Sequence, residues 1–169
     1  MESSQTHHER VFIKLSGEAL KGDGSSHLSP AVLERVARDI ADLIRAKKQV
    51  ALMMGGGNFW RGAQNVTAID RVAGDYMGML ATIMNGVALK SVLEHHGIPA
   101  RILSGLDVPR VCKSFTQRAA KASLAAGQVV INVGGLGEPY FTTDTGAVLR
   151  AVEMGCTVLL KATSVDGVY

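Results

Sequence analysis

A lysine near the end of an apolar run is the first candidate for a catalytic residue. Lys14 follows Val11-Phe12-Ile13, and a lysine in such surroundings is costly to bury without a partner. An ammonium group at this place can neutralise the charge on a transferring phosphoryl group. Lys161 ends a later apolar run in the same way. Each of the two is either a site residue or an ordinary lysine on the polar face of a strand.

Glycine is the second signal, with 19 residues where average usage of about 7% would give about 12. Much of the excess follows apolar runs, at Gly17, in Gly55-Gly56-Gly57 and in Gly134-Gly135-Leu136-Gly137. Because glycine has no Cβ, phosphate oxygens can approach successive backbone N–H groups, and a helix N-terminus beyond the loop adds unpaired donors. The loops therefore favour a phosphate site, and tight strand-to-helix turns are the alternative interpretation.

The common phosphate-binding motifs do not occur. Gly17 and Gly22 have the spacing of a Walker A loop, but Asp23 follows where that motif needs a lysine. There is no G-x-G-x-x-G dinucleotide motif, and the D-F-G and H-R-D motifs of protein kinases are also missing. The sequence therefore predicts a phosphate binder of another family.

Several polar residues near the loops have a functional and a structural interpretation. Arg61 can donate two parallel hydrogen bonds to phosphate oxygens, or it can be a solvated loop arginine. Asp75 on its own fits a helix surface or a cap. Thr142, Thr143 and Asp144 have the pattern of a helix N-terminus, for which capping alone is a sufficient explanation.

These residues need a scaffold, and the pattern of apolar runs predicts one. Strands are expected at residues 11–15, 50–54, 98–103, 129–133 and 157–160, mostly as continuous apolar runs of the kind that helices cover on both faces. Helices are expected from Ser29-Pro30 onward and at about 71–96, 116–126 and 145–154. Gly74, Gly78 and Gly86 predict a break in the second of these. Alternating strands and helices predict an α/β three-layer sandwich around a mainly parallel central sheet.

Composition excludes several classes of protein. The net charge is only +3 and the basic residues are interleaved with acidic ones, so a nucleic-acid partner is not expected. Cys112 and Cys156 stand alone, which fits a reducing cytoplasm. No apolar stretch approaches about 18 residues, so no membrane span is expected. Residues 1–9 are polar and are expected to form a disordered tail.

Several stretches then coincide with one family. They are Lys14-Leu15-Ser16-Gly17-Glu18, Gly55-Gly56-Gly57-Asn58 with Arg61-Gly62, Gly74-Asp75-Tyr76-Met77-Gly78-Met79-Leu80, Pro139-Tyr140-Phe141-Thr142-Thr143-Asp144, Lys161-Ala162-Thr163 and Val165-Asp166-Gly167-Val168-Tyr169. In this order they resemble the bacterial UMP kinases (uridylate kinases) of the amino-acid kinase superfamily. The resemblance covers nearly the whole chain from Arg10 on. It implies an amino-acid kinase-like domain over residues 10–169.

The resemblance implies a reaction and a site. The reaction is transfer of the γ-phosphoryl group of MgATP to UMP, giving UDP and ADP in pyrimidine nucleotide biosynthesis. The implied catalytic residues are Lys14, Arg61 and Asp144. The implied ATP-binding residues are Lys14, Leu15, Ser16, Gly17, Gly57, Arg61, Thr163 and Tyr169. The implied UMP-binding residues are Gly56, Asp75, Leu136, Gly137, Glu138, Pro139, Tyr140, Phe141, Thr142 and Thr143. Mg²⁺ is implied only as the companion of ATP, with no metal ligand among the side chains.

The resemblance also implies a cytoplasmic and usually homohexameric protein, and many family members respond to GTP or UTP. Arg101 matches the effector region of the family, whereas Lys90 and Glu94 add only weak support. They continue beyond the position of Tyr169, so the resemblance implies a domain incomplete at its C-terminus. It places the acid that organises the catalytic lysine in that further part. Two alternatives remain at this point. One is a non-catalytic module of the same fold that binds a nucleotide or an oxyanion, and the other is a different enzyme of the superfamily.

Overall fold

Six strands form the centre of the molecule in a computed structural model that describes residues 9–22, 26–60 and 68–162. The strands are β1 (Arg10–Leu15), β2 (Gln49–Met54), β3 (Ala100–Ser104), β4 (Lys113–Ser114), β5 (Val129–Val133) and β6 (Val158–Ala162). They lie in the order β4-β3-β5-β2-β1-β6, and every strand pair among the described residues is parallel. The predicted three-layer α/β sandwich is confirmed.

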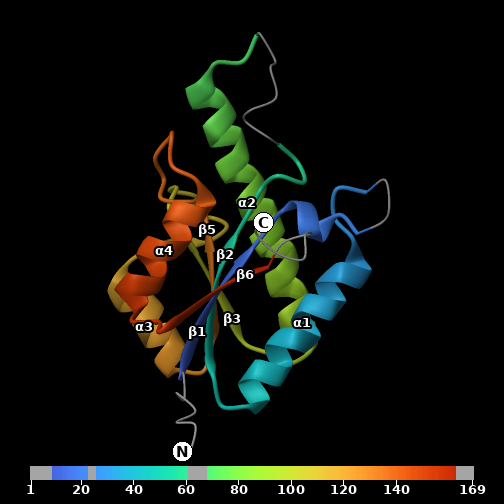
Figure 1. The fold of residues 1–169 in the computed structure, drawn as a ribbon, viewed down its shortest axis with the longest axis vertical. Helices are drawn as coiled ribbons and strands as arrows, with labels where there is room; N and C mark the ends of the chain where they lie inside the picture. The colour runs from blue at the N-terminus through green and yellow to red at the C-terminus, as the bar shows by residue number, and fades with distance from the viewer. Residues whose placement is uncertain (1–8, 23–25, 61–67, 163–169) are drawn as a thin grey trace, which may run out of the picture.

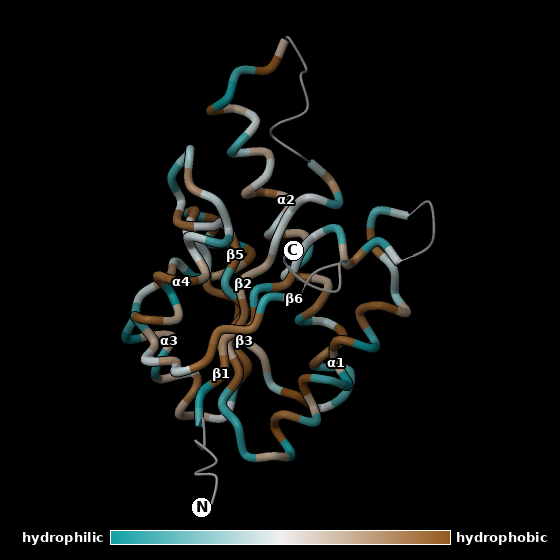
Figure 2. The backbone as a smooth tube through the Cα atoms, in the orientation of Figure 1, coloured by the Kyte–Doolittle hydropathy of each residue, from teal (hydrophilic) through white to brown (hydrophobic). Residues whose placement is uncertain are grey.

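Two helices cover each face of the sheet (Figure 1). On one face lie α1 (Pro30–Arg45) and α2 (Arg71–His95), and on the other lie α3 (Gln117–Ala125) and α4 (Thr143–Met154). A short 3-10 helix, η1 (Glu18–Leu20), follows β1. Apolar residues concentrate in the strands between the helical layers (Figure 2). A continuous apolar run therefore marks a strand that is buried on both faces, as expected.

Local signals set the ends of the helices. The side chains of Ser29, Asp70 and Thr142 each accept a hydrogen bond from the backbone N–H three residues later, which caps α1, α2 and α4. Helix α4 ends at Gly155, whose φ of 70° is left-handed backbone that glycine adopts without strain. These caps fix where each glycine loop ends and its helix begins.

The predicted break in α2 is wrong, because the helix is continuous from Arg71 to His95. Its glycines serve close packing instead. A Cβ on Gly86 would collide with Val133 of β5, and a Cβ on Gly56 would lie 2.5 Å from the carbonyl oxygen of Gly78. The glycines therefore let α2 approach both β5 and the loop after β2.

Other differences concern the strands. β4 has only two exposed residues and too little pattern to be predicted. The third and last expected strands begin one or two residues later than predicted and also end later, at Ser104 and Ala162. Strand β6 is an edge strand, and both Leu159 and Leu160 are exposed on it.

Helix α2 differs from the other helices on its outer side. By length and composition alone it could cross a membrane, and among the described residues it is the one helix of which that is true. Its inner side packs on the sheet through buried residues such as Ile83, Leu89 and Leu93. Packing in the core therefore explains the apolar residues on this side of the helix. Its outer side carries exposed apolar residues at helical spacing, a set we call the α2 stripe: Val72, Tyr76, Leu80, Met84 and Val87.

Candidate active site

The loops after β1 and β2 interlock at the carboxyl ends of the strands, where ligands bind in sheets of this kind. The backbone N–H of Gly55 donates to the carbonyl oxygen of Leu15 at 2.8 Å. A Cβ on Gly17 would lie 2.5 Å from the backbone nitrogen of Gly57, so only a glycine fits there. Ser16 lies in the chain between Leu15 and Gly17, which make these two contacts. The four residues predicted for ATP binding in this region, from Leu15 to Gly17 and Gly57, are therefore neighbours.

Three charged side chains meet beside this loop pair, and we call them the charge cluster: Lys14, Asp144 and Lys161. The Lys14 ammonium lies 2.9 Å from Asp144 Oδ1, and the Lys161 ammonium donates to Asp144 Oδ2 at 2.9 Å. The lysines are paired residues of the parallel strands β1 and β6, while Asp144 lies in the first turn of α4. Lys14 is largely buried, with 12% of its side chain exposed, whereas Asp144 is about half exposed. One carboxylate therefore holds two ammonium groups side by side.

The pKa of Asp144 reflects this arrangement. Burial on its own raises the pKa of the carboxyl group, but the hydrogen bonds and charges of Lys161 and Lys14 outweigh burial, and the pKa falls below its ordinary value. The cluster therefore carries one net positive charge at neutral pH, which suits an anionic ligand.

A pocket of about 130 Å³ lies next to the charge cluster, between α2 and the loop after β5. Residues predicted for UMP that line it are Gly56, Asp75, Leu136, Glu138, Phe141 and Thr143. Thr143 precedes Asp144 in α4, so the pocket and the charge cluster are joined through two consecutive residues. We call this the glycine-loop pocket.

Asp75 ties the two walls of the glycine-loop pocket together. Its Oδ2 accepts from the backbone N–H of Tyr140 at 2.8 Å and from Arg71 Nε at 2.8 Å. Burial raises the pKa of Asp75, but the Tyr140 N–H and Arg71 lower it by more, so the net pKa lies below its ordinary value. Tyr140 has a φ of 69°, a backbone conformation that a non-glycine residue adopts at a cost. Asp75 thus holds a strained loop at the mouth of the pocket.

Other predicted UMP residues shape the loop without lining the pocket. Gly137 has a φ of 86°, and a Cβ there would collide with the carbonyl oxygen of Gly105. Thr142 uses its hydroxyl to cap α4, as the structural interpretation had it. Pro139 and Tyr140 lie at the tip of the loop, where Tyr140 is exposed. Arg61, Thr163 and Tyr169 lie outside the described residues, as do residues 1–8 of the expected tail.

Sequence reasoning missed part of this site. Within the described residues Asp144 contacts Lys14, while the acid expected beyond Tyr169 lies outside them and stays a prediction. Lys161 was considered without being chosen, although its position at the end of an apolar run was the available signal. Asn58, Thr82 and Asn85, buried around the pocket, were not singled out, because no local pattern marks a buried hydrogen bond between distant residues.

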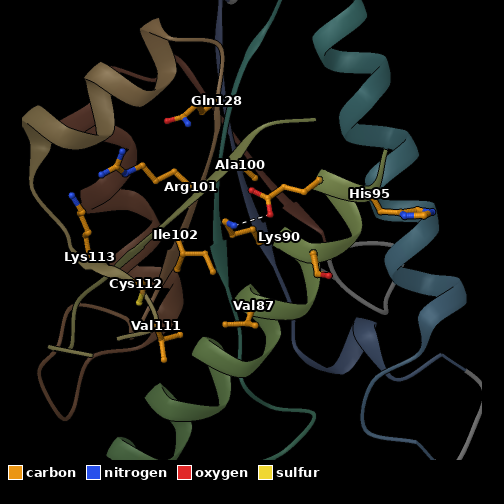
Figure 3. Close-up of a pocket in the computed structure, with 12 residues that line it drawn as sticks. Val87, Lys90, His95, Ala100, Arg101, Ile102, Val111, Cys112, Lys113 and Gln128 are labelled. Carbon is orange, nitrogen blue, oxygen red and sulfur yellow. Dashed lines mark hydrogen bonds and ion pairs between the residues drawn. The ribbon is translucent and has the colours of Figure 1, made fainter. Parts of the chain in front are cut away.

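A second concave region, which we call the edge groove, lies away from the charge cluster. It has a volume of about 860 Å³ between α2 and the β3 edge of the sheet. Figure 3 shows Lys90 on α2 and Arg101 and Lys113 on β3 and β4 among its lining residues. Lys90 also pairs with Glu94 at 2.7 Å. The groove therefore combines several cations with one acid.

Comparisons with known proteins agree with one another. The family model described as "Amino acid kinase family" matches residues 9–169. A uridylate kinase of Xanthomonas axonopodis pv. citri is 47% identical over 167 residues, which covers 98% of this chain and 70% of the relative. A uridylate kinase of Legionella pneumophila is 49% identical over 163 residues, which covers 96% of this chain and 66% of that relative.

Solved structures give the same result. The crystal structure of UMP kinase from Ureaplasma parvum superposes with a TM-score of 0.90 at 37% identity, covering 96% of this chain and 70% of that one. The UMP kinase of Bacillus anthracis also has a TM-score of 0.90, at 35% identity, covering 95% of this chain and 67% of that one.

Proposed function

The chain belongs to the amino acid kinase family, on its uridylate kinase branch, and from this we propose how its residues phosphorylate UMP with ATP. The reaction is a phosphoryl transfer between two nucleotides. An oxygen of the UMP phosphate forms a bond to the γ-phosphorus of ATP, and the bond from that phosphorus to the bridging oxygen of ADP breaks. The second pKa of a phosphate monoester is about 6, so the attacking oxygen is already deprotonated at neutral pH. The enzyme therefore needs positioning and charge stabilisation, and no general base.

The main support for this proposal is the charge cluster. In the transition state, negative charge spreads over the oxygens of the transferring group, and Lys14 and Lys161 are held side by side to meet it. Asp144 keeps the two ammonium groups together against their mutual repulsion. With no covalent intermediate to form, this fixed pair of cations is the main contribution of the described residues to the rate.

The two nucleotides occupy neighbouring regions in this proposal. The ATP phosphates lie along Leu15, Ser16, Gly17 and Gly57, with Arg61 on the phosphates and Thr163 and Tyr169 toward the nucleoside. UMP lies in the glycine-loop pocket, against Gly56 and Asp75 and under the loop formed by Leu136, Gly137, Glu138, Pro139, Tyr140, Phe141, Thr142 and Thr143. Support comes from the position of the pocket, which adjoins the charge cluster through Thr143 and Asp144.

Magnesium enters this proposal as part of the substrate MgATP. Mg²⁺ prefers carboxylate oxygens, and both carboxylate oxygens of Asp144 are engaged by lysines. Among the described residues there is no group of three acidic, histidine or cysteine side chains that could hold a metal ion. The donor set therefore favours an ion carried by the phosphates of ATP.

A steady-state assay tests the proposed function. ADP formation is measured with UMP, CMP, aspartate and acetylglutamate as acceptors, and we expect turnover with UMP to exceed the others. A chimera that adds the unmatched part of the Xanthomonas relative is assayed beside the chain, because the match covers only 70% of that relative. Preference for a carboxylate acceptor, or ATP binding without UMP-dependent turnover in both proteins, would overturn the proposal.

We also propose that the edge groove takes the GTP or UTP effector. Arg101, Lys90 and Lys113 offer cations for a triphosphate, and the groove is separate from the glycine-loop pocket. The Arg101→Ala variant should lose the response to GTP while its basal turnover stays within about twofold, since a lost phosphate contact weakens effector binding alone. An unchanged GTP response would overturn this assignment.

Finally, we propose that the protein is a cytoplasmic homohexamer in which the α2 stripe is buried between subunits. An apolar patch of this kind is unusual on the surface of a monomer. Sedimentation should show a hexamer that a charged substitution, Leu80→Glu, breaks into smaller species. Sedimentation of the unmodified chain as a monomer at micromolar concentration would contradict the proposal.

A further inference from the structure

Three polar side chains are buried between α2 and the loops of the active site. Asn58, Thr82 and Asn85 are at most 2% exposed. Burial of a polar group without a hydrogen bond costs free energy, and buried polar groups in native proteins are therefore hydrogen-bonded. Their partners show what these residues hold in place.

Asn58 and Asn85 form a reciprocal amide pair. Asn58 Nδ2 donates to Asn85 Oδ1 at 2.9 Å, and Asn85 Nδ2 donates to Asn58 Oδ1 at 2.8 Å. The second N–H of Asn85 goes to the carbonyl oxygen of Gly55 at 2.7 Å, and that of Asn58 goes to the carbonyl oxygen of His27 at 2.7 Å. Flipping either amide would bring oxygens against oxygens, so the pattern fixes both orientations. Helix α2 thereby holds the loop Gly55-Gly56-Gly57-Asn58 at its first and last residues.

Thr82 anchors the second glycine loop, the one after β5, to α2 in the same way. Its Oγ1 accepts from the backbone N–H of Gly134 at 2.7 Å and donates to the carbonyl oxygen of Met79 at 2.6 Å. Thr82 and Asn85 are three residues apart on α2 and so lie on one face of the helix. One helical turn therefore holds both glycine loops, and we call Asn58, Thr82 and Asn85 the α2 mount.

We propose that Asn85 and Thr82 are positioning residues: Asn85 holds the loop after β2, whose Gly57 is assigned to ATP and Gly56 to UMP, and Thr82 holds the loop after β5, on the UMP side. The inference rests on the proposed function for the identity of the two nucleotides. Glycines lack side chains that could anchor their own loop, and their backbone loses the most conformational freedom on ordering. An outside support is therefore needed, because a displacement of about 1 Å can cost about a hundredfold in rate. Thr82 also lines the glycine-loop pocket, but it is only 1% exposed and its hydroxyl is engaged by Gly134 and Met79. In this account both residues therefore act through backbone atoms.

The prediction is a difference between the two variants. Asn85→Leu, which keeps the number of heavy atoms but removes the amide, should raise KM for ATP and KM for UMP about tenfold each, because Gly56 and Gly57 both lie in the loop that Asn85 holds. Thr82→Val, which replaces the hydroxyl with a methyl group, should raise KM for UMP about tenfold and change KM for ATP less than twofold. Thr82→Ser restores the hydroxyl and should return KM for UMP to within about threefold of the original. A purely structural role for Thr82 would change both KM values together, or neither.

The controls separate this inference from stability and from the proposed function. Asn132→Leu removes another fully buried amide, one that donates to the carbonyl oxygen of Leu52 within the sheet, and should lower the melting temperature without raising either KM. Calorimetric Kd values for ATP and UMP test the same pattern without turnover, so absence of catalysis would count against the proposed function alone. If Asn85→Leu fails to fold, Asn58→Leu breaks the pair from the loop side and is judged by the same criterion. Equal shifts for ATP and UMP in Thr82→Val, or unchanged affinity for both nucleotides in Asn85→Leu, would overturn the proposal.

Discussion

The charge cluster and the α2 mount both adjoin the glycine-loop pocket, through Thr143 and Thr82, and are built from opposite kinds of interaction. The charge cluster consists of three ions, and Asp144 at its centre is about half exposed. The α2 mount consists of neutral amides and a hydroxyl that water does not reach. Ions in contact with solvent can exchange one partner for another, whereas a buried neutral pair has no alternative partner.

This difference suits the two regions to separate tasks. In the proposed mechanism the lysines stay on Asp144 and also take up phosphate oxygens when substrates arrive, so their contacts should be able to adjust. The mount must hold the glycine loops through the whole cycle, so its bonds should be permanent and insensitive to pH. Changes in the cluster should therefore alter the chemical step, and changes in the mount should alter binding. Four experiments test this separation.

The largest effect is expected at Lys14. Lys14→Met should lower kcat by about a thousandfold, equivalent to about 4 kcal/mol of lost transition-state stabilisation, with KM for UMP almost unchanged. Lys121→Met, an exposed position on α3, is the matched control and should leave kcat as it is. If Lys14→Met instead raised KM and left kcat unchanged, Lys14 would act in substrate binding alone. The distinction between the two regions would then fail.

A smaller loss of about a hundredfold in kcat is expected for Asp144→Asn. The amide keeps the shape but cannot hold two ammonium groups together, so the lysines separate and the charge they present is misplaced. Asp144→Glu keeps the carboxylate and should recover part of the rate. The measurement is single-turnover formation of ADP, which isolates the chemical step. Full activity in Asp144→Asn would mean that Asp144 does not organise the lysines.

At the mouth of the glycine-loop pocket, Asp75→Ala should raise KM for UMP about tenfold, the value of a hydrogen bond to a charged group. The Tyr140 N–H loses its acceptor, and the strained loop is then free to relax. KM for ATP should stay within about twofold, because Asp75 lies on the UMP side. Equal changes for both nucleotides would show that the loop is shared between the two binding regions.

The smallest effect is a pH dependence that belongs to the cluster and is absent from the mount. Because the folded pKa of Asp144 is lowered, its contribution to stability is complete above the unfolded value of about 4 and is lost as the pH falls through the folded pKa. Chemical unfolding at pH 7 and below pH 4 should show a smaller acid loss for Asp144→Asn than for the unmodified chain. The Thr82→Val variant should show the same acid loss as the unmodified chain.

Local sequence signals were enough for the scaffold but not for all the contacts made on it. Ser29 and Thr142 predicted helix starts because a cap involves only neighbours in the chain. The continuity of α2 could not be predicted, since Gly86 breaks a helix by propensity and is needed here for contact with Val133. A glycine in a helix is therefore ambiguous until the opposing strand is known.

The candidate site divides in the same way. Lys14 and the glycine loops could be recognised from their positions after apolar runs, and the resemblance to UMP kinases supplied Asp75 and Asp144. The amide pair could not be recognised from the sequence, because Asn58 and Asn85 are 27 residues apart and meet only once α2 packs on the loop. The pairing of Lys14 with Lys161 required the register of β1 and β6, which no pattern within either strand reveals.

That register has a consequence for how such chains can diverge. Lys14 and Lys161 are direct neighbours across two strands and share one carboxylate. A lineage that lost the acid would leave two cations repelling each other, and loss of either lysine would then relieve the strain. A lineage that lost one lysine would relax the demand for the acid. The three residues should therefore be inherited as a unit, and descendants that abandon catalysis should lose them in quick succession while retaining the buried α2 mount.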